Sequence, residues 1–585
     1  MFHIKKIALV FMLVFWVISM QGCEKLMSKK VSLDGTWQFK YDPQNEGVAN
    51  EWYSPELIRN DWTDEAVPGE WDDGQYDGLA WYATTFEYGK LASGYKLALV
   101  FESVDDNAIV WLNGQQIAEH HGWGQLFFVD ISDVYQPEGV NHLVVRIEDL
   151  GGPGGINKDV YLKPYTTLAD LYATPVSKKT APPSPEWAKN AVVYEVFVRS
   201  YSQAGTFKAL ENDLPRITDL GVDILWLMPI HPVGRERAKG SYGSPYAVAD
   251  YYGVNPRMGT LADFKSLVDS VHARGMKLIL DFVLNHSSWD NALITEHPEW
   301  YTHDEQGIIV SPNADWYDVA DFNYDQQALR EYMIEMLQWW LTETDVDGFR
   351  FDVAELVPND FWTAAKSACQ TVKSDVFFLA EGAKPELHLH GHDMTYSWNV
   401  WDYLTQVAQG KAAVSQLRQS IEMEQYQYPR GALRMRFTEN HDKPRSRAYI
   451  GDADLNLTAW AFVALMQGNP LIYAGQEIAE TIQPTLFEKD VIKWSRGDEE
   501  LARAMKDLIE LRNTHIRSNS PFEIVMADDG KQVIGYRHGE LVAFFNFSLE
   551  PFRFSIKGMQ SILAGGLIET TDGLVLLPKQ FGVIQ

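Results

Sequence analysis

The stretch GFRFDVAEL, residues 348–356, decides how the rest of this chain is interpreted. Apolar and charged residues alternate in its first half, which is typical of a short β-strand with one polar face. Arg350 and Asp352 are two residues apart and therefore lie on the same face. A guanidinium keeps a neighbouring carboxylate ionised and fixes its direction, as a carboxylate nucleophile requires. A structural ion pair is the alternative at this point.

An amphipathic segment precedes this strand. Residues 328–343 carry large apolar side chains at helical spacing, which predicts a helix laid on a sheet. The pair Asp347-Gly348 ends that pattern.

The alternation of strands and helices extends over residues 191–515. We expect buried strands at 192–198, 222–228, 277–284, 348–353, 375–380, 432–437 and 470–473. About eight such units predict a (β/α)8 TIM barrel rather than an open doubly wound sheet. No glycine-rich phosphate fingerprint follows the first strand, which also disfavours a dinucleotide fold.

The flanking regions have β-type patterns, so the whole chain is predicted to be a multidomain α/β protein. Residues 31–165 predict an N-terminal β-sandwich, and residues 516–585 predict a C-terminal antiparallel β-sandwich. The proline-containing segment 166–190 is interpreted as a linker. Residues 287–324 are long for a barrel connection, so we expect a small inserted domain over the site.

The composition is that of a soluble globular protein. A chain of 585 residues is too long for one core. A net charge of −30 argues against a nucleic-acid partner. Two cysteines, Cys23 and Cys369, provide no disulfide framework. The 20 tryptophans favour a carbohydrate partner because aromatic rings stack on sugars, although large cores account for many of them.

The N-terminus has the pattern of an export signal. Lys5 and Lys6 precede an apolar run at 7–20, which is too short for a transmembrane helix and predicts a signal peptide over 1–22. Gly22-Cys23 resembles a bacterial lipoprotein processing site and implies a lipid anchor at Cys23. We therefore expect an exported lipoprotein of the outer membrane or cell surface, facing the outside or the periplasm. The alternative is ordinary secretion with an incidental cysteine.

Polar residues follow several expected strands. In a TIM barrel the C-terminal ends of the strands meet at one mouth. The residues at these ends are Asp281, Asn285 and His286 after the third strand, Arg350 and Asp352 on the fourth, Glu381 after the fifth, and His441 and Asp442 after the seventh. Any one of them could be structural, but together they predict a catalytic site.

The segments around these residues resemble the four signature regions of the α-amylase family of glycoside hydrolases. They are DFVLNH (281–286), GFRFDVAEL (348–356), FFLAEG (377–382) and FTENHD (437–442), in the order of the family. The resemblance implies three catalytic carboxyl groups: the nucleophile Asp352, the acid/base Glu381 and the transition-state stabiliser Asp442. It also implies a sugar-binding subsite formed by Tyr246, His286, Arg350 and His441.

These roles fit a retaining glycosidase, which needs one ionised and one protonated carboxyl group. We expect Arg350 to keep Asp352 charged. Glu381 has no cation in its own motif and faces two other carboxylates, so we expect it to hold a proton near neutrality.

The expected function is hydrolysis of α-1,4-glucosidic bonds in starch or maltooligosaccharides with retention, in the manner of neopullulanase-like or maltodextrin-cleaving members. One alternative is a transglycosylase that uses the same site on the same α-glucans. A non-catalytic, surface starch-binding lipoprotein is the other, and the intact carboxylate trio argues against it. The oligomeric state is left open.

The chain departs from the family pattern at three places. Glu355-Leu356 stand where Lys-His is often found, Ala247 replaces an aspartate, and residues 200–207 lack the aspartate- and glycine-rich calcium loop. No metal or cofactor is therefore assigned. Calcium stays open through the oxygen of Asn285.

The N-terminal region has its own resemblance. LDGTWQF (33–39) and DDNAIVWLNGQQIAEHHG (105–122) resemble the jelly-roll sugar-binding domain of family 2 glycoside hydrolases. This implies a carbohydrate-binding module, in which tryptophans either line a glucan-binding face or form the core. They are Trp37, Trp52, Trp62, Trp71, Trp81, Trp111 and Trp123. A β-glycoside hydrolase is disfavoured because the catalytic motifs follow the α-amylase pattern.

Overall fold

The computed structural model describes residues 30–71, 76–120, 124, 126–151, 154–554, 562–571 and 573–585. The predicted signal peptide, Cys23 and Trp123 lie outside the described residues. The chain divides into two compact units, Met1–Ala173 and Thr174–Gln585. In the described part of the chain, no helix combines the length and the apolar character needed to cross a bilayer.

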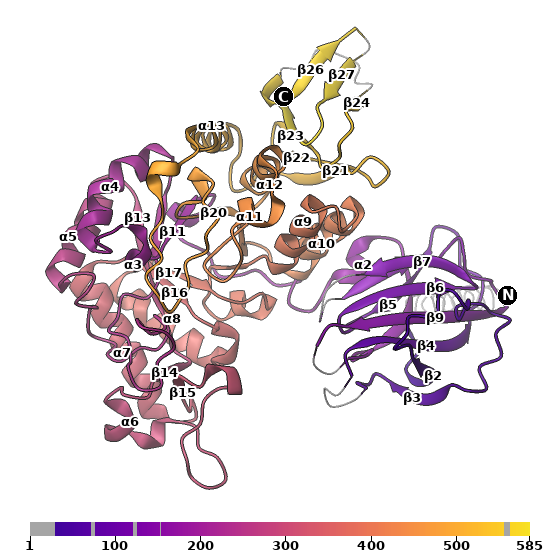
Figure 1. The fold of residues 1–585 in the computed structure, drawn as a ribbon, viewed down its shortest axis with the longest axis horizontal. Coiled ribbons are helices and arrows are strands. Elements are labelled where there is room, and N and C mark those ends of the chain that lie inside the picture. The colour runs from indigo at the N-terminus through magenta and orange to yellow at the C-terminus, as the bar shows by residue number, and fades with distance from the viewer. Residues whose placement is uncertain are drawn as a thin grey trace, which may run out of the picture. The chain divides into compact units, whose positions relative to one another are not determined.

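Two antiparallel sheets form the first unit and confirm the predicted β-sandwich (Figure 1). One sheet has the strand order β1-β10-β5-β8, and the other has the order β3-β2-β4-β9-β6-β7. The strands are β1 (Val31–Ser32), β2 (Gly35–Tyr41), β3 (Thr63–Val67), β4 (Gly78–Glu87), β5 (Lys96–Phe101), β6 (Asn107–Leu112), β7 (Gln115–His120), β8 (Phe127–Asp130), β9 (Val140–Asp149) and β10 (Val160–Tyr165).

Most of the described tryptophans of this sandwich are buried in two separate apolar clusters. Apolar residues from both sheets form the central core, because alternate side chains of each strand point inward. A second cluster lies on the other face of the six-stranded sheet, around Trp52, Trp81 and Trp111. Among the described tryptophans of this unit, the buried ones are Trp37, Trp52, Trp71, Trp81 and Trp111. Trp62 is half-buried and packs edge-on against Trp52.

The segment predicted as a linker begins with ordered structure. Helix α2 (Leu168–Tyr172) lies within 166–190 and buries Leu171 and Tyr172. Tyr172 contacts the ring of Phe128 on β8, so this end of the segment belongs to the sandwich.

Eight parallel strands close into a barrel in the second unit, which confirms the predicted TIM barrel. In barrel order they are β11 (Val193–Val196), β12 (Ile224–Leu227), β13 (Lys277–Phe282), β16 (Gly348–Phe351), β17 (Phe377–Ala380), β18 (Met394–Tyr396), β19 (Leu433–Arg436) and β20 (Asn469–Tyr473). Strand β18 is absent from the predicted set. It has three residues, too few for an alternating or apolar run to identify it.

Helices surround the barrel, as Figure 1 shows for α4, α5, α7 and α8. The helices of this unit are α3 (Val198–Tyr201), α4 (Phe207–Asp219), α5 (Leu261–His272), α6 (Leu293–Glu296), α7 (Gln327–Thr344), α8 (Asn359–Val372), α9 (Trp398–Ala408), α10 (Val414–Gln427), α11 (Ser446–Ile450), α12 (Ala453–Leu465) and α13 (Glu499–His515). The first apolar run, predicted as one strand over 192–198, includes the beginning of α3 because its Val198 already belongs to that helix.

The transition from α7 to β16 places the charged residues of the fourth strand. Helix α7 matches the predicted helix 328–343 and buries its apolar stripe against the barrel. Asp345 ends the helix in a left-handed conformation. A Cβ atom on Gly348 would lie 2.1 Å from the carbonyl oxygen of Phe377, so glycine allows β16 and β17 to approach.

Helix α8 carries Cys369, a fully buried side chain and the one free cysteine among the described residues. Burial raises the pKa of its thiol to about 12. This cysteine therefore behaves as a small apolar core residue.

The segment inserted after β13 forms a small lobe of its own. Strands β14 (His286–Ser288) and β15 (Val319–Asp321) pair antiparallel within it. Trp300 and Tyr301 are buried beneath them. In Figure 1 this lobe includes α6 and lies next to the strands of the barrel.

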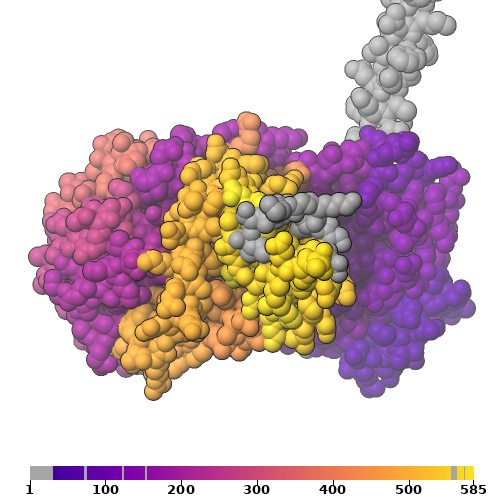
Figure 2. All heavy atoms as spheres, turned by 90° about the horizontal axis from the view of Figure 1, so that it is seen from above, coloured from indigo at the N-terminus to yellow at the C-terminus, as the bar shows by residue number. Residues whose placement is uncertain are grey.

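The C-terminal strands pack on the barrel helices. They form a five-stranded sheet, β21-β22-β23-β28-β25, and a three-stranded sheet, β24-β27-β26. Their bounds are β21 (Phe522–Asp528), β22 (Val533–His538), β23 (Leu541–Asn546), β24 (Phe552–Phe554), β25 (Ile562–Gly565), β26 (Leu567–Thr570), β27 (Gly573–Leu576) and β28 (Phe581–Ile584). Figure 2 shows the yellow C-terminal strands against the orange segment that precedes them. Tyr536 donates a hydrogen bond of 2.7 Å to the carbonyl oxygen of Phe462 on α12.

Candidate active site

A cavity of about 200 Å³ opens at the C-terminal ends of the barrel strands. Connections from separate strands supply its walls, and the inserted lobe contributes to one side. The lining residues are Lys239, Ser244, Tyr246, His286, Trp316, Asp318, Val319, Asp352, Val353, Glu381, Asp442, Leu486 and Phe487. The three carboxyl groups predicted to be catalytic therefore share one cavity.

Arg350 lies beneath the cavity and contacts three carboxyl groups. Its Nη1 atom is 3.0 Å from Oδ1 of Asp281 and 3.1 Å from Oδ1 of Asp352. Its Nη2 atom is 2.9 Å from Oε2 of Glu381. Its Nε atom donates to the hydroxyl of Tyr396 at 3.2 Å. Burial disfavours the charge of Arg350, but the surrounding acids outweigh this effect and raise its pKa.

The electrostatics differ from the sequence-based expectation for Asp352. Burial raises the pKa of Asp352 well above its ordinary range, the charge of Glu381 raises it further, and Arg350 opposes both effects. The expectation that Arg350 keeps Asp352 charged is therefore not confirmed, because burial and Glu381 outweigh the guanidinium. One guanidinium faces three carboxyl groups, so without substrate Asp352 holds a proton more readily than an exposed aspartate.

Glu381 has no cation in its own motif, but the folded chain brings Arg350 of another strand next to it. Its Oε2 atom contacts Arg350 and accepts a hydrogen bond of 2.8 Å from the backbone N–H of Val353. Val353 has a φ of 38°, a left-handed conformation that is strained for a β-branched residue. Val353 directly follows Asp352 in the chain, and its N–H binds Glu381. This one residue therefore links the positions of the two carboxyl groups.

His441 lies in a chain of polar contacts beside Asp442. Its Nε2 atom is 3.2 Å from Oδ2 of Asp442 and 2.7 Å from the hydroxyl of Tyr246. Its Nδ1 atom contacts the buried carboxylate of Glu195. Burial opposes the charged form, but Asp442 and Glu195 outweigh it and raise the pKa of His441 to about 9. The imidazole is therefore positively charged at neutral pH.

The side chain of Asp442 is 34% exposed and reaches the cavity. It is more accessible than Asp352, whose side chain is 11% exposed. Asp442 can thus meet a bound ligand while it also contacts His441.

His286 and Tyr246 line the cavity as the sequence predicts. Burial lowers the pKa of His286 to about 3, so this ring is neutral at neutral pH. The Tyr246 ring stacks on His441 with 5.5 Å between ring centres, and its hydroxyl donates to Asp281 at 3.2 Å.

Several groups of the site were given no role in the sequence analysis. Glu195 is the charged residue in the apolar run 191–198 of the first strand, a signal that could have been used. Tyr396 lies on β18, the strand that was not predicted. Trp316, Leu486 and Phe487 reach the cavity from connections whose course only the folded chain defines.

Among the described residues, one set of three acidic side chains has the spacing of metal ligands. It lies in the first unit, at Asp105, Asp106 and Asp149. At the barrel mouth, Asn285 donates through Nδ2 to Nδ1 of His286 at 3.3 Å.

The profile described as "Alpha amylase, catalytic domain" matches residues 190–319 and 300–520. The chain belongs to the α-amylase family. A profile described as "Glycosyl hydrolase 2 galactose-binding domain-like" matches residues 73–150 of the sandwich. Both matches agree with the resemblances found in the sequence.

Individual relatives extend this assignment to α-amylase-family proteins of known name. The α-amylase MalA of Haloarcula japonica is 28% identical over 393 residues, which are 63% of this chain and 57% of that protein. An α-1,4-glucan:maltose-1-phosphate maltosyltransferase of Cereibacter sphaeroides is 29% identical over 369 residues, 56% of this chain and 52% of that protein. The chain thus spans little more than half the length of these two relatives.

A solved structure of the family covers the same region. The maltogenic α-amylase AmyB of Thermotoga neapolitana superposes with a TM-score of 0.60 and 34% identity, over 68% of this chain and 96% of that one. The region in common is the α-amylase fold.

Proposed function

We propose that this α-amylase-family member hydrolyses α-1,4-glucosidic bonds of starch or maltooligosaccharides with retention of configuration. The observation that supports this most directly is the shared guanidinium of Arg350, which contacts both Asp352 and Glu381. The guanidinium therefore holds the two carboxyl groups close together, with one contact of 3.1 Å to Asp352 and one of 2.9 Å to Glu381. Retaining glycosidases hold their nucleophile and acid about 5–5.5 Å apart, a separation that this shared contact allows.

The first step breaks the glycosidic bond. Glu381 donates its proton to the glycosidic oxygen while a carboxylate oxygen of Asp352 attacks the anomeric carbon. The shortened glucan leaves with a new hydroxyl, and an ester joins the sugar to Asp352. This step requires a proton on Glu381 and a negative charge on Asp352, the charge that the contact with Arg350 favours.

The second step regenerates the protein. The carboxylate of Glu381 removes a proton from water, the resulting oxygen attacks the anomeric carbon, and the ester bond to Asp352 breaks. Two inversions give net retention. The carboxylate of Asp442, which lies beside the charged ring of His441, would accept hydrogen bonds from hydroxyls of the same sugar.

Product stereochemistry tests the proposal. Maltoheptaose is digested and followed by proton NMR from the first minute, and we expect the α-anomer of the new reducing end to form before mutarotation. Initial formation of the β-anomer would contradict double displacement. Binding without any release of reducing ends would instead favour the non-catalytic starch-binding protein.

A second candidate, transglycosylation of α-glucans, rests on the cavity wall. Trp316 and Phe487 are half-buried aromatic side chains of that wall, and such rings can stack on an acceptor sugar that competes with water. The maltosyltransferase similarity agrees with this alternative. Maltotriose at high concentration separates the two: products longer than maltotriose indicate transfer, and maltose plus glucose alone indicate hydrolysis.

We also infer that the protein is exported and held at a membrane by a lipid on Cys23. The support is the apolar run 7–20 followed by Gly22-Cys23. Mass spectrometry of the N-terminal peptide should find a diacylglyceryl group on Cys23, and the Cys23→Ser variant should appear in the soluble fraction. An unmodified Cys23 in a membrane-free protein would contradict the anchor.

A further inference from the structure

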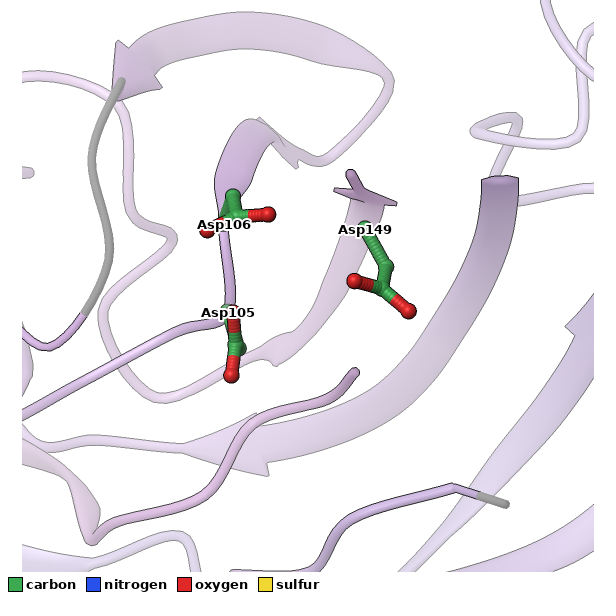
Figure 3. A group of neighbouring side chains, drawn as sticks. All are labelled: Asp105, Asp106 and Asp149. Atoms are coloured by element: carbon green, nitrogen blue, oxygen red, sulfur yellow. The ribbon is translucent and has the colours of Figure 1, made fainter. Parts of the chain in front are cut away.

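Three aspartates meet at one end of the N-terminal sandwich. Asp105 and Asp106 directly precede β6, and Asp149 ends β9. Each offers a carboxylate oxygen, and these oxygens lie within 4.8 Å of one another. Figure 3 shows one oxygen of Asp149 directed toward Asp105 and Asp106, which lie next to each other on the opposite side.

Two of the three aspartates are almost fully buried, unlike the members of a solvated acidic cluster on a protein surface. Asp105 is 4% exposed and Asp149 is 2% exposed. Asp149 accepts a hydrogen bond from the N–H of Gly151 through Oδ1, at 2.9 Å. Its Oδ2 atom is buried and has no hydrogen-bond partner among the described residues.

Asp149 lies close to other acidic side chains. In the ranges described, neither Asp106 nor Asp149 forms an ion pair with a lysine or arginine. Burial raises the pKa of Asp149, and the charges of Asp77 and Asp106 raise it further. A buried acceptor without a partner is costly, so a further group is needed to satisfy Oδ2.

We propose that Asp105, Asp106 and Asp149 bind a calcium ion. The offered ligands are all oxygen, which suits a hard cation and not zinc. Magnesium is usually held by one or two carboxylates and keeps several of its waters, whereas calcium accepts several carboxylate oxygens in one flexible site. A group of three aspartates therefore suits calcium better than magnesium.

The backbone around these residues is already held in place. Asp105 donates its N–H to the carbonyl oxygen of Gly155 at 2.9 Å, and Asp106 donates to that of Glu148 at 3.0 Å. Asp106 also accepts a hydrogen bond of 2.8 Å from the N–H of Leu150 through Oδ2. The ion would bind to a largely formed site and would join the connection before β6 to the end of β9. This role is structural and separate from the proposed hydrolysis.

The test compares calcium binding in matched variants of the soluble chain from residue 24 onward. Each protein is stripped with EDTA, dialysed, and titrated with calcium chloride by calorimetry, and its unfolding is followed with and without calcium. The variants are Asp149→Asn and Asp106→Asn. The control is Asp64→Asn, which changes an exposed carboxylate on β3 of the same sandwich.

We expect the parent chain and Asp64→Asn to bind one more equivalent of calcium than Asp149→Asn and Asp106→Asn. Calcium should raise the unfolding temperature of the sandwich in the first two proteins only. Any calcium bound by the barrel cancels in this comparison. If Asp149→Asn does not fold, the half-exposed Asp106 gives the same readout.

Equal stoichiometry in all four proteins would overturn the proposal. The proposal would also be overturned if calcium did not raise the unfolding temperature of the sandwich in the parent chain. A proton, and not calcium, would then satisfy Oδ2 of Asp149. An equal shift with magnesium chloride at the same concentration would overturn the assignment to calcium.

Discussion

At the scale of residues, the candidate site depends on one arginine that serves several acids. The sequence identified Arg350, Asp352, Glu381 and Asp442 because they follow buried strands in recognisable motifs. It could not predict their protonation, because that depends on burial and on distances between separate strands. The short spacing of Arg350 and Asp352 suggested a dedicated ion pair, whereas the folded chain divides the same guanidinium among Asp281, Asp352 and Glu381.

Removing either reacting carboxyl group should abolish turnover while sugar binding survives. We expect Glu381→Gln to lower kcat by about 10²–10⁴-fold, because the leaving oxygen loses its acid. Asp352→Asn should lower it further, because no ester can form. Initial rates on maltoheptaose and calorimetric binding measure the two properties. Glu386→Gln, an exposed carboxylate on the same connection as Glu381, is the control and should keep its activity. Near-parental rates in either active-site variant would refute the assigned roles.

Replacing Glu195 should move the alkaline limb of the pH profile. His441 has a pKa of about 9 because Asp442 and Glu195 stabilise its charge. In Glu195→Gln one of these charges is lost, so the pKa of His441 falls and kcat/KM should decline at a lower pH than in the parent. The control Asp454→Asn changes an exposed acid on α12 and should leave the limb in place.

The raised pKa of His441 also makes the stability of the fold depend on pH in a defined direction. The folded pKa of His441 exceeds the ordinary value of about 6.5, so its contribution to stability is complete below that value and disappears as pH rises toward 9. Urea unfolding at pH 6 and pH 10 should show a smaller pH-dependent loss in Glu195→Gln than in the parent. An unchanged loss together with an unchanged alkaline limb would argue that Glu195 does not act through His441.

At the scale of elements, the barrel was predictable because its long helices and apolar strands repeat. Helix α7 was found within one residue at each end from its apolar stripe. Strand β18 was not found, since three residues between Asp393 and Ser397 leave no pattern to detect. The course of the connections could not be predicted either, because their side chains are placed by neighbours distant in sequence.

Gly348 is the element-scale position where a methyl group should do most harm. Its Cβ would meet the carbonyl oxygen of Phe377 at 2.1 Å, and the backbones of two paired strands would have to separate. We expect Gly348→Ala to lower the free energy of unfolding by about 1–3 kcal/mol or more. In Gly530→Ala, the nearest atom to the new methyl group is Oδ1 of Asp528 at 3.5 Å, so this control should stay within about 0.5 kcal/mol of the parent. Equal urea midpoints for the two variants would contradict the close approach.

At the scale of the whole molecule, the regions that flank the barrel in sequence differ in whether they share its core. The C-terminal strands share a core with the barrel: Phe545 and Val583 belong to the same apolar cluster as α12. Lys579 also pairs with Asp452 at 2.7 Å. The sandwich, by contrast, has a core of its own. Sequence patterns indicated these three regions, but not which of them share a core.

Truncations should separate these dependencies. A chain that begins at Thr174 should fold and cleave maltoheptaose at a rate within about threefold of the parent. Its retention on amylose in affinity electrophoresis should fall if the sandwich binds glucan. A chain that ends at His515 should be insoluble or inactive, because it exposes the apolar surface of α12. Full activity in the chain ending at His515, or none in the chain beginning at Thr174, would reverse this assignment.

The buried thiol of Cys369 can report how often the barrel opens locally. A maleimide or disulfide reagent can reach that sulfur only while α8 is displaced from the strands beneath it. In a chain without Cys23, the rate of labelling would then report spontaneous displacements of α8, at a cysteine that the chain already contains. Comparing the labelling rates with and without maltooligosaccharide would show whether a glucan bound at the barrel mouth reduces the local opening of α8.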